Sequence, residues 1–424
     1  MVKHFYNHYR FLGIVCIKYQ VIDYDNFGEV MGKLDIENLQ SNRISNLPPY
    51  VFTVINRLKN EARMRGIDVI DLGMGSPDIM VPEPIRKEMA RAINERHINR
   101  YPSGDGAIEL KRAVAYWYGK RFNVDLNPND EVSILIGSKE GIANLSAAFL
   151  NRDDYALVPS PTYPIFFNSV IIFGGTLYNV PLLEENDYLP DFERIDPAVL
   201  RRSKLMFLSY PHNPTTVSVD KDYFKDIVRF AEEHRIIISH DAAYSELCFD
   251  GYKAPSFMQV EDAKEVGIEF HSFSKTFSMA GWRVAFAVGN SEVLKVLKKM
   301  KSYVDFGVFS AIQKAAIVAL ELHDDIVNET VDIYQRRRDI LCDGLDELGW
   351  QHKRPRATMY VWVKIPESYN EMTSQEFASL MVRETGVAVA PGIGFGEAGN
   401  DHIRFALVQP EDRIAEAVER LKKL

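Results

Sequence analysis

The residues of this chain that are best placed to do chemistry lie in one run, from Ser272 to Arg283. Lys275 has serine hydroxyls three residues and one residue before it, at Ser272 and Ser274, and Arg283 follows eight residues after it. A lysine amine forms Schiff bases with aldehydes, while hydroxyls and a guanidinium can hold phosphate oxygens. The grouping suits an aldehyde cofactor that also carries a phosphate. An exposed lysine in a polar loop would have the same neighbours, so this run alone leaves both interpretations open.

A second pair of candidates follows the apolar run at residues 236–238. A short apolar run bounded by polar residues indicates a buried strand, and Asp241 and Tyr244 lie at its end. A buried carboxylate needs a cationic partner, and a protonated pyridine nitrogen is one that also makes the ring an electron sink. Tyr244 could donate to a phenolate oxygen of that ring. Alternatively, Asp241 caps the next helix, Tyr244 packs in the core, and the adjacent His240 is a packed histidine rather than a base.

Two further strand ends carry candidate residues. Residues 205–209 lead into a Tyr-Pro-His-Asn-Pro turn, where the amide of Asn213 could reach a phenolate oxygen and a substrate carboxylate. Residues 132–136 lead through a glycine-flanked turn into an apolar helix, whose first N–H groups form an anion site beside Ser138 and Lys139. Neither turn is specific alone, because Asn-Pro is common in turns and the glycine spacing matches neither a Walker loop nor a dinucleotide fingerprint.

In this order, the four segments resemble the class I/II aminotransferases, which are pyridoxal 5′-phosphate enzymes of fold type I. The resemblance covers about Asn42 to Leu424. It implies that Lys275 holds the cofactor and then moves a proton at the substrate, while Asp241 keeps the ring nitrogen protonated. It also implies roles for four other residues: Tyr163 stacks on the cofactor ring, Tyr101 reaches the phosphate of the neighbouring subunit in a homodimer, Gly75 contacts the substrate carboxylate through its backbone, and Arg404 clamps the α-carboxylate. The role of Arg404 also has physical sense, because a planar guanidinium fits a carboxylate bidentately.

Within the family, the chain looks most similar to the bacterial alanine (glutamate–pyruvate) aminotransferases, on Leu47–Phe52, Lys301–Gly307 and Pro391–Gly396. It is also similar to the LL-diaminopimelate aminotransferases, especially at Asp241–Glu246. Those enzymes typically carry asparagine where this chain has Tyr303, which counts against diaminopimelate as the donor.

We therefore expect L-alanine and 2-oxoglutarate as substrates, with LL-diaminopimelate as the alternative donor. Tyr50, Lys139 and Tyr303 are the candidates for shaping the substrate pocket. A lyase or decarboxylase of the same fold type remains an alternative, because the same cofactor constellation serves those reactions. A regulator that uses such a domain as a sensor would need a DNA-binding module, for which the short acidic N-terminus leaves no room.

The composition excludes several other classes of protein. A net charge of −9 over 424 residues speaks against binding nucleic acid or an anionic membrane. Three scattered cysteines (Cys16, Cys248 and Cys342) form neither a disulfide framework nor a zinc pattern, so we expect a cytoplasmic protein. The histidines show no ligand spacing, and we expect no metal site. No apolar stretch reaches the roughly 20 residues of a membrane span. The apolar run at residues 11–17 is a poor signal peptide, and Met31 could be the natural start.

The order of the expected elements predicts an α/β fold. Apolar runs near residues 132–136, 155–158, 204–208, 236–239, 268–271 and 284–288 alternate with helical patterns, which is typical of a doubly wound, mostly parallel sheet. Candidate residues repeatedly follow a strand, where open α/β sheets bind ligands. A long helix is expected from Asp324 to Gly349, then a strand at Tyr360–Lys364 and a helix at Glu411–Leu424. We predict an extension (residues 1–41), a large cofactor-binding domain (82–323), and a smaller α+β domain built from both chain ends (42–81 and 324–424).

Overall fold

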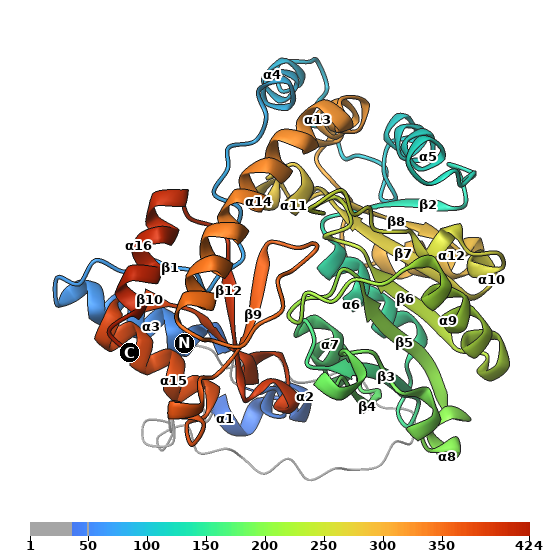
Figure 1. The fold of residues 1–424 in the computed structure, drawn as a ribbon. Coiled ribbons are helices and arrows are strands. Elements are labelled where there is room, and N and C mark those ends of the chain that lie inside the picture. The colour runs from blue at the N-terminus through green and yellow to red at the C-terminus, as the bar shows by residue number, and fades with distance from the viewer. Residues whose placement is uncertain (1–35, 49–50) are drawn as a thin grey trace, which may run out of the picture. The chain divides into compact units, whose positions relative to one another are not determined.

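The structure is a computed structural model, and it describes residues 36–48 and 51–424 (Figure 1). The chain divides into two compact units, Met1–Ser45 and Asn46–Leu424. The described part of the first unit forms two short helices, α1 (Ile36–Leu39) and α2 (Asn42–Ser45). All predicted site residues belong to the second unit.

The second unit is built on a seven-stranded sheet with the order β2-β8-β7-β6-β5-β3-β4 (Figure 1). Six of the seven strands run in the same direction, and β8 runs in the opposite direction. The strands are β2 (Val132–Leu135), β3 (Tyr155–Ser160), β4 (Thr176–Pro181), β5 (Ser203–Ser209), β6 (Ile237–Asp241), β7 (Gly267–Ser272) and β8 (Ala285–Gly289). The central strands are buried almost throughout, as expected for a mostly parallel sheet that is covered on both faces.

Helices pack on both faces of this sheet. Apolar residues of α6 (Ser138–Phe149), α7 (Ile165–Phe173) and α12 (Ser291–Ser302) cover one face. Apolar residues of α5 (Ile108–Phe122), α9 (Lys221–His234) and α13 (Ser310–Glu321) cover the other. The connecting helices are α4 (Glu83–Ala92), α8 (Pro197–Leu200), α10 (Ala263–Val266) and α11 (Phe273–Thr276). The predicted doubly wound α/β arrangement is confirmed.

Two smaller sheets lie in the rest of the unit, and one of them joins its two ends. Strand β1 (Ile70–Asp71) pairs in parallel with β10 (Val387–Ala388), and β11 (Ala390–Pro391), β12 (His402–Ala406) and β9 (Tyr360–Lys364) form an antiparallel sheet. Four helices complete this region: α3 (Val51–Met64), α14 (His323–Glu347), α15 (Ser374–Thr385) and α16 (Glu411–Leu421). Their apolar residues share one core with the strands. The α+β part built from both chain ends is confirmed, and its boundaries stay a prediction.

The local signals in the sequence explain most of these elements. Helix α15 begins with a capping box between Thr373 and Glu376 and ends at Gly386, which has φ +70°. Each predicted strand is present. The edge strand β4 was not predicted, because its half-exposed residues do not form an apolar run. Within residues 36–48 and 51–424, no helix is long and apolar enough to cross a bilayer, and no group of His, Cys, Asp and Glu side chains is placed to hold a metal ion.

Candidate active site

The predicted residues meet in one cavity at the carboxyl ends of β5, β6 and β7. The cavity measures about 240 Å³, and its wall includes Gly75, Ser138, Lys139, Tyr163, Asn213, Asp241, Tyr244, Ser272, Ser274, Lys275, Arg283 and Arg404. A wider hollow of about 370 Å³ lies between α7 and residues 393–397, but its walls are mostly apolar and hold none of the predicted residues. The chemistry therefore belongs to the smaller cavity.

Lys275 enters the cavity from α11, the short helix that follows β7. Ser272 caps this helix, and its hydroxyl accepts a hydrogen bond from the Ser274 backbone N–H at 3.1 Å. The Lys275 amine donates to the carbonyl oxygen of Gly75. Burial lowers the pKa of the Lys275 ammonium, which favours the unprotonated amine needed by a nucleophile.

Asp241 is a buried carboxylate at the end of β6, and its Oδ1 atom has no hydrogen-bond partner among the described residues. Burial raises its pKa to about 6, against opposing interactions with His240 and the Ala243 backbone N–H. A buried acid without a cationic partner is unfavourable when ionised. The site is therefore suited to a ligand that brings a positively charged N–H group to Asp241.

The start of α6 and Arg283 form an anion-binding corner. Gly137 precedes α6 with φ +128°, and an added Cβ atom there would collide with the guanidinium of Arg283. The first N–H groups of a helix lack intrahelical acceptors and favour an anion. The hydroxyl of Ser138 is buried and unpartnered within the described chain. Lys139 lies beside it and is exposed at the cavity rim.

Arg404 is a second buried group that lacks a counter-charge. It lies on β12 and is only 2 % exposed. Its Nη1 atom donates to Asn213 Oδ1 at 2.7 Å and its Nη2 atom to the Gly73 carbonyl at 3.1 Å, whereas Nε has no partner in the described chain. No carboxylate of the described residues forms an ion pair with it. Since a buried guanidinium needs an anion, the site favours a ligand carboxylate at Arg404.

A row of hydroxyl and amide groups runs from Arg404 to Tyr360. Asn213 Nδ2 donates to the Tyr244 hydroxyl at 3.5 Å, and the hydroxyls of Tyr244 and Tyr360 lie 3.0 Å apart. Burial raises the pKa of Tyr244 well above its usual value. Burial alone would also raise the pKa of Tyr360, but the charges of Arg404 and Lys275 outweigh it and lower that pKa. This row can orient a polar ligand and hold a proton.

Tyr360 is a site residue that the sequence analysis missed. Its ring lies under the guanidinium of Arg404, with 3.9 Å between the Arg404 Cζ atom and the ring centroid. A Cβ atom at Gly75 would collide with its hydroxyl, so glycine at that position makes room for Tyr360. The alternation of residues 360–364 predicted the strand, but only the pairing of β9 with β12 places Tyr360 in the cavity.

Tyr163 and Gly75 line the same cavity, Tyr163 between β3 and α7 and Gly75 after β1. Two other predicted residues do not. Tyr101 and Tyr303 are 81 % and 83 % exposed, and neither lines the cavity of its own chain. Tyr50 lies outside the described residues. The expectations that Tyr101 reaches the phosphate of a neighbouring subunit and that Tyr50 and Tyr303 shape the substrate pocket stay predictions.

These features fit pyridoxal 5′-phosphate. Asp241 offers an unpaired carboxylate to a ring N–H, Ser138, Arg283 and the start of α6 offer donors to a phosphate, and Lys275 offers an amine to an aldehyde. Arg404 remains available for the carboxylate of an amino acid.

Comparisons with known proteins agree with this geometry. The sequence model of the family described as aminotransferase class I and II matches residues 67–421. An LL-diaminopimelate aminotransferase from Halothermothrix orenii is 46 % identical over 90 % of this chain and 97 % of its own length. The structure of BacF from Bacillus subtilis superposes with a TM-score of 0.86 and 38 % identity, covering 91 % of this chain and 98 % of BacF. A probable N-succinyldiaminopimelate aminotransferase from Thermus thermophilus has a TM-score of 0.83 and 34 % identity, covering 88 % and 100 % of the two chains.

Proposed function

The chain belongs to the class I and II aminotransferases and depends on pyridoxal 5′-phosphate, and from this premise we propose that its amino donor is LL-diaminopimelate and its acceptor 2-oxoglutarate. We choose this donor because curated relatives of the chain share the name LL-diaminopimelate aminotransferase. These relatives are 42–46 % identical to this chain over about nine-tenths of its length. These relatives favour the alternative donor of the sequence analysis over L-alanine.

Each residue of the cavity then has a defined task. When bound, the cofactor supplies an aldehyde and a ring that withdraws electrons from the substrate Cα atom. Lys275 is held beside Gly75, from where its amine can take the Cα proton and return it one step later. Asp241 would keep a proton on the ring nitrogen, and Arg404 with Asn213 would hold the α-carboxylate. Tyr244 and Asn213 would offer hydrogen bonds to the phenolate oxygen of the ring.

The rim of the cavity supports a substrate with a second carboxylate. Lys139 is exposed at the rim and forms no ion pair with any described residue. LL-diaminopimelate, glutamate and 2-oxoglutarate each carry a carboxylate beyond the one that Arg404 binds, and alanine does not. An exposed ion pair contributes at most roughly 1 kcal/mol, so Lys139 favours a dicarboxylic donor over alanine by a small factor.

L-Alanine remains the second candidate donor because of Tyr303. The phenol stands where the diaminopimelate enzymes typically carry asparagine, and it caps the end of α12 on an exposed surface. A larger ring in place of an amide changes both the room and the hydrogen bonds that are available to a long polar substrate.

We expect kcat/KM for LL-diaminopimelate to exceed that for L-alanine by up to about fivefold, because one additional exposed charged contact contributes at most roughly 1 kcal/mol. The measurement is a donor panel with 2-oxoglutarate as acceptor. Tyr303→Asn should raise the ratio further if Tyr303 reaches the substrate of a partner chain. The matched control is Tyr116→Asn, since Tyr116 is also an exposed tyrosine and lies on α5, away from the cavity. If the wild-type protein preferred alanine, the proposed donor would be wrong, but the assignment of transamination would be unaffected.

We also propose a homodimer with shared active sites. Tyr101 packs on Phe306 with 4.5 Å between ring centroids, and together with the exposed Tyr303 and Val304 they form an apolar surface. Large apolar side chains gathered on a surface mark an interaction site.

Light scattering on a size-exclusion column should therefore give twice the chain mass of 48.5 kDa at micromolar concentration. Phe306→Glu should weaken the dimer at least about tenfold, since burial of a phenylalanine contributes roughly 1.5–3 kcal/mol. The matched control is Met64→Glu, an equally drastic change at an 80 % exposed position outside this surface. A fully active monomer would refute the shared site.

A further inference from the structure

A buried carboxylate behind the active site has no role in the chemistry described so far. Glu269 lies on β7, is fully buried, and accepts five hydrogen bonds. Oε1 accepts from the Tyr118 hydroxyl, from Ser256 Oγ at 2.7 Å and from His271 Nε2 at 2.8 Å. Oε2 accepts from His240 Nδ1 at 2.8 Å and from the Phe257 backbone N–H at 2.7 Å. Burial alone would raise the pKa of Glu269, but the bonds from His240 and His271 hold it well below its usual range.

The bond to His240 fixes which ring nitrogen carries the proton. His240 Nε2 lies 3.1 Å from the backbone nitrogen of Tyr210, and a backbone N–H can only donate. Nε2 must therefore be the unprotonated acceptor, so Nδ1 carries the hydrogen that is donated to Glu269. A carboxylate that only accepts enforces this tautomer.

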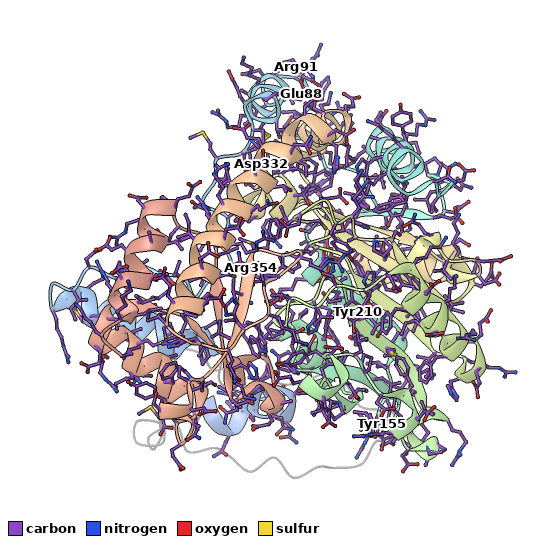
Figure 2. The ribbon with its side chains drawn as sticks, in the orientation of Figure 1. Glu88, Arg91, Tyr155, Tyr210, Asp332 and Arg354 are labelled. Carbon is purple, nitrogen blue, oxygen red and sulfur yellow. The ribbon has the colours of Figure 1, made fainter. Side chains whose placement is uncertain are left out.

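The anchored N–H group belongs to the loop that delivers Asn213. Tyr210, labelled in Figure 2, is the first residue after β5, and the chain turns from there through His212 to Asn213. The Asn213 amide is itself oriented, because Oδ1 accepts from Arg404 and Nδ2 donates to Tyr244. The hydrogen-bonded chain Glu269–His240–Tyr210 therefore ends three residues before a group that faces the cofactor.

We propose that Glu269 is a positioning residue of the active site, which holds His240 in the tautomer that anchors Tyr210 and thereby places the Asn213 amide against the cofactor's phenolate oxygen. This inference rests on the cofactor role proposed for Asn213. With the cofactor bound, an amide that donates to this oxygen would draw negative charge away from it and would lower its affinity for a proton. The pH midpoint of the bound cofactor's visible absorption therefore reports the position of Asn213.

Methionine at position 269 tests the proposal, because it removes both acceptor oxygens with little change in side-chain length. Glutamine is the matched comparison: its carbonyl oxygen can still accept from His240 and Phe257, while its amide nitrogen faces the Ser256 and Tyr118 hydroxyls, which can accept. We expect Glu269→Met to bind the cofactor and to raise the absorption midpoint by about one pH unit, and Glu269→Gln to leave it unchanged. Asn213→Ala should raise it by a similar amount to Glu269→Met, and the double variant should add nothing further, because both changes act through one group.

Tyr118→Phe is the matched control. It removes a different donor from Glu269 and leaves the bonds to His240 and Phe257 in place. It should lower the melting temperature and leave the absorption midpoint unchanged, which separates positioning from a general loss of stability. Should Glu269→Met fail to fold, His240→Asn is the second variant, since its shorter side chain cannot bridge Glu269 and Tyr210.

Three results would overturn the proposal. The first is an unchanged midpoint in a folded Glu269→Met or His240→Asn protein. The second is a shift in Glu269→Met that adds to the shift in Asn213→Ala. The third is no shift in Asn213→Ala itself, which would remove the group through which Glu269 is proposed to act. None of these results depends on the identity of the amino donor, so they are distinct from a failure of the proposed substrate.

Discussion

Replacement of Lys275 by alanine is expected to abolish turnover while the fold survives. The amine that would hold the cofactor and move the Cα proton is lost, and general acid–base catalysis alone contributes about 10²–10⁴ in rate. We expect the rate to fall by at least about a thousandfold and the visible absorption of the bound cofactor to be lost or shifted. Turnover with 2-oxoglutarate and the absorption spectrum of the purified variant are the measurements.

The matched control for this variant is Lys299→Ala, a lysine exposed on α12 whose side chain faces away from the cavity wall. It should leave turnover and spectrum unchanged. Because Lys275 contributes only its bond to the Gly75 carbonyl in the absence of ligand, its loss should change the melting temperature little. Normal activity in Lys275→Ala would show that this cavity is not the active site.

Replacement of Asp241 by asparagine is expected to keep the cofactor bound and to lose most of the rate. A neutral amide cannot stabilise a positively charged ring nitrogen, so several kcal/mol of transition-state stabilisation disappear, on the order of a thousandfold in rate. The pH dependence has a defined sign. Burial raises the pKa of Asp241 to about 6 in the unliganded protein, so below that pH the carboxylate is protonated and cannot pair with the ring. Wild-type cofactor affinity should therefore fall below about pH 6 and that of Asp241→Asn should not.

The competing interpretation of Asp241 is a structural cap, and Asp220→Ala provides the comparison. The side chain of Asp220 accepts from the Tyr223 N–H at 3.1 Å at the start of α9, and Asp220 does not line the cavity. Its loss should cost about 1 kcal/mol of unfolding free energy and leave turnover intact. If Asp241→Asn behaved in the same way, with a rate loss below about tenfold, Asp241 would be a cap rather than a partner of the ring.

The parts of the site that lie at strand ends could be predicted from the sequence. Asn213, Asp241 and Lys275 each follow an apolar run, and parallel strands bring their carboxyl ends to one edge of the sheet. Strand β4 escaped prediction because its exposed edge position does not require an apolar run.

Residues that depend on packing between distant segments could not be found in this way. Tyr360 enters the cavity only because β9 pairs with β12, where its register partner is Ala406. In the sequence, Glu269 is a single charged residue within an apolar strand. The positioning role proposed for it depends on side chains of α5 and β6 that form hydrogen bonds with it. Tyr101 and Tyr303 are exposed on a single chain, and the role predicted for Tyr101 requires a second copy of the chain, which one sequence does not place.

The central claim is that this chain moves an amino group from LL-diaminopimelate to a 2-oxo acid in two separate half-reactions. The most direct test loads the purified protein with LL-diaminopimelate in the absence of acceptor, removes the free donor by gel filtration, and then adds 2-oxoglutarate. The account predicts about one molecule of L-glutamate per chain, since a two-step exchange stores one amino group at each site. Glutamate far below one equivalent per chain, from protein that holds its full complement of cofactor, would contradict it.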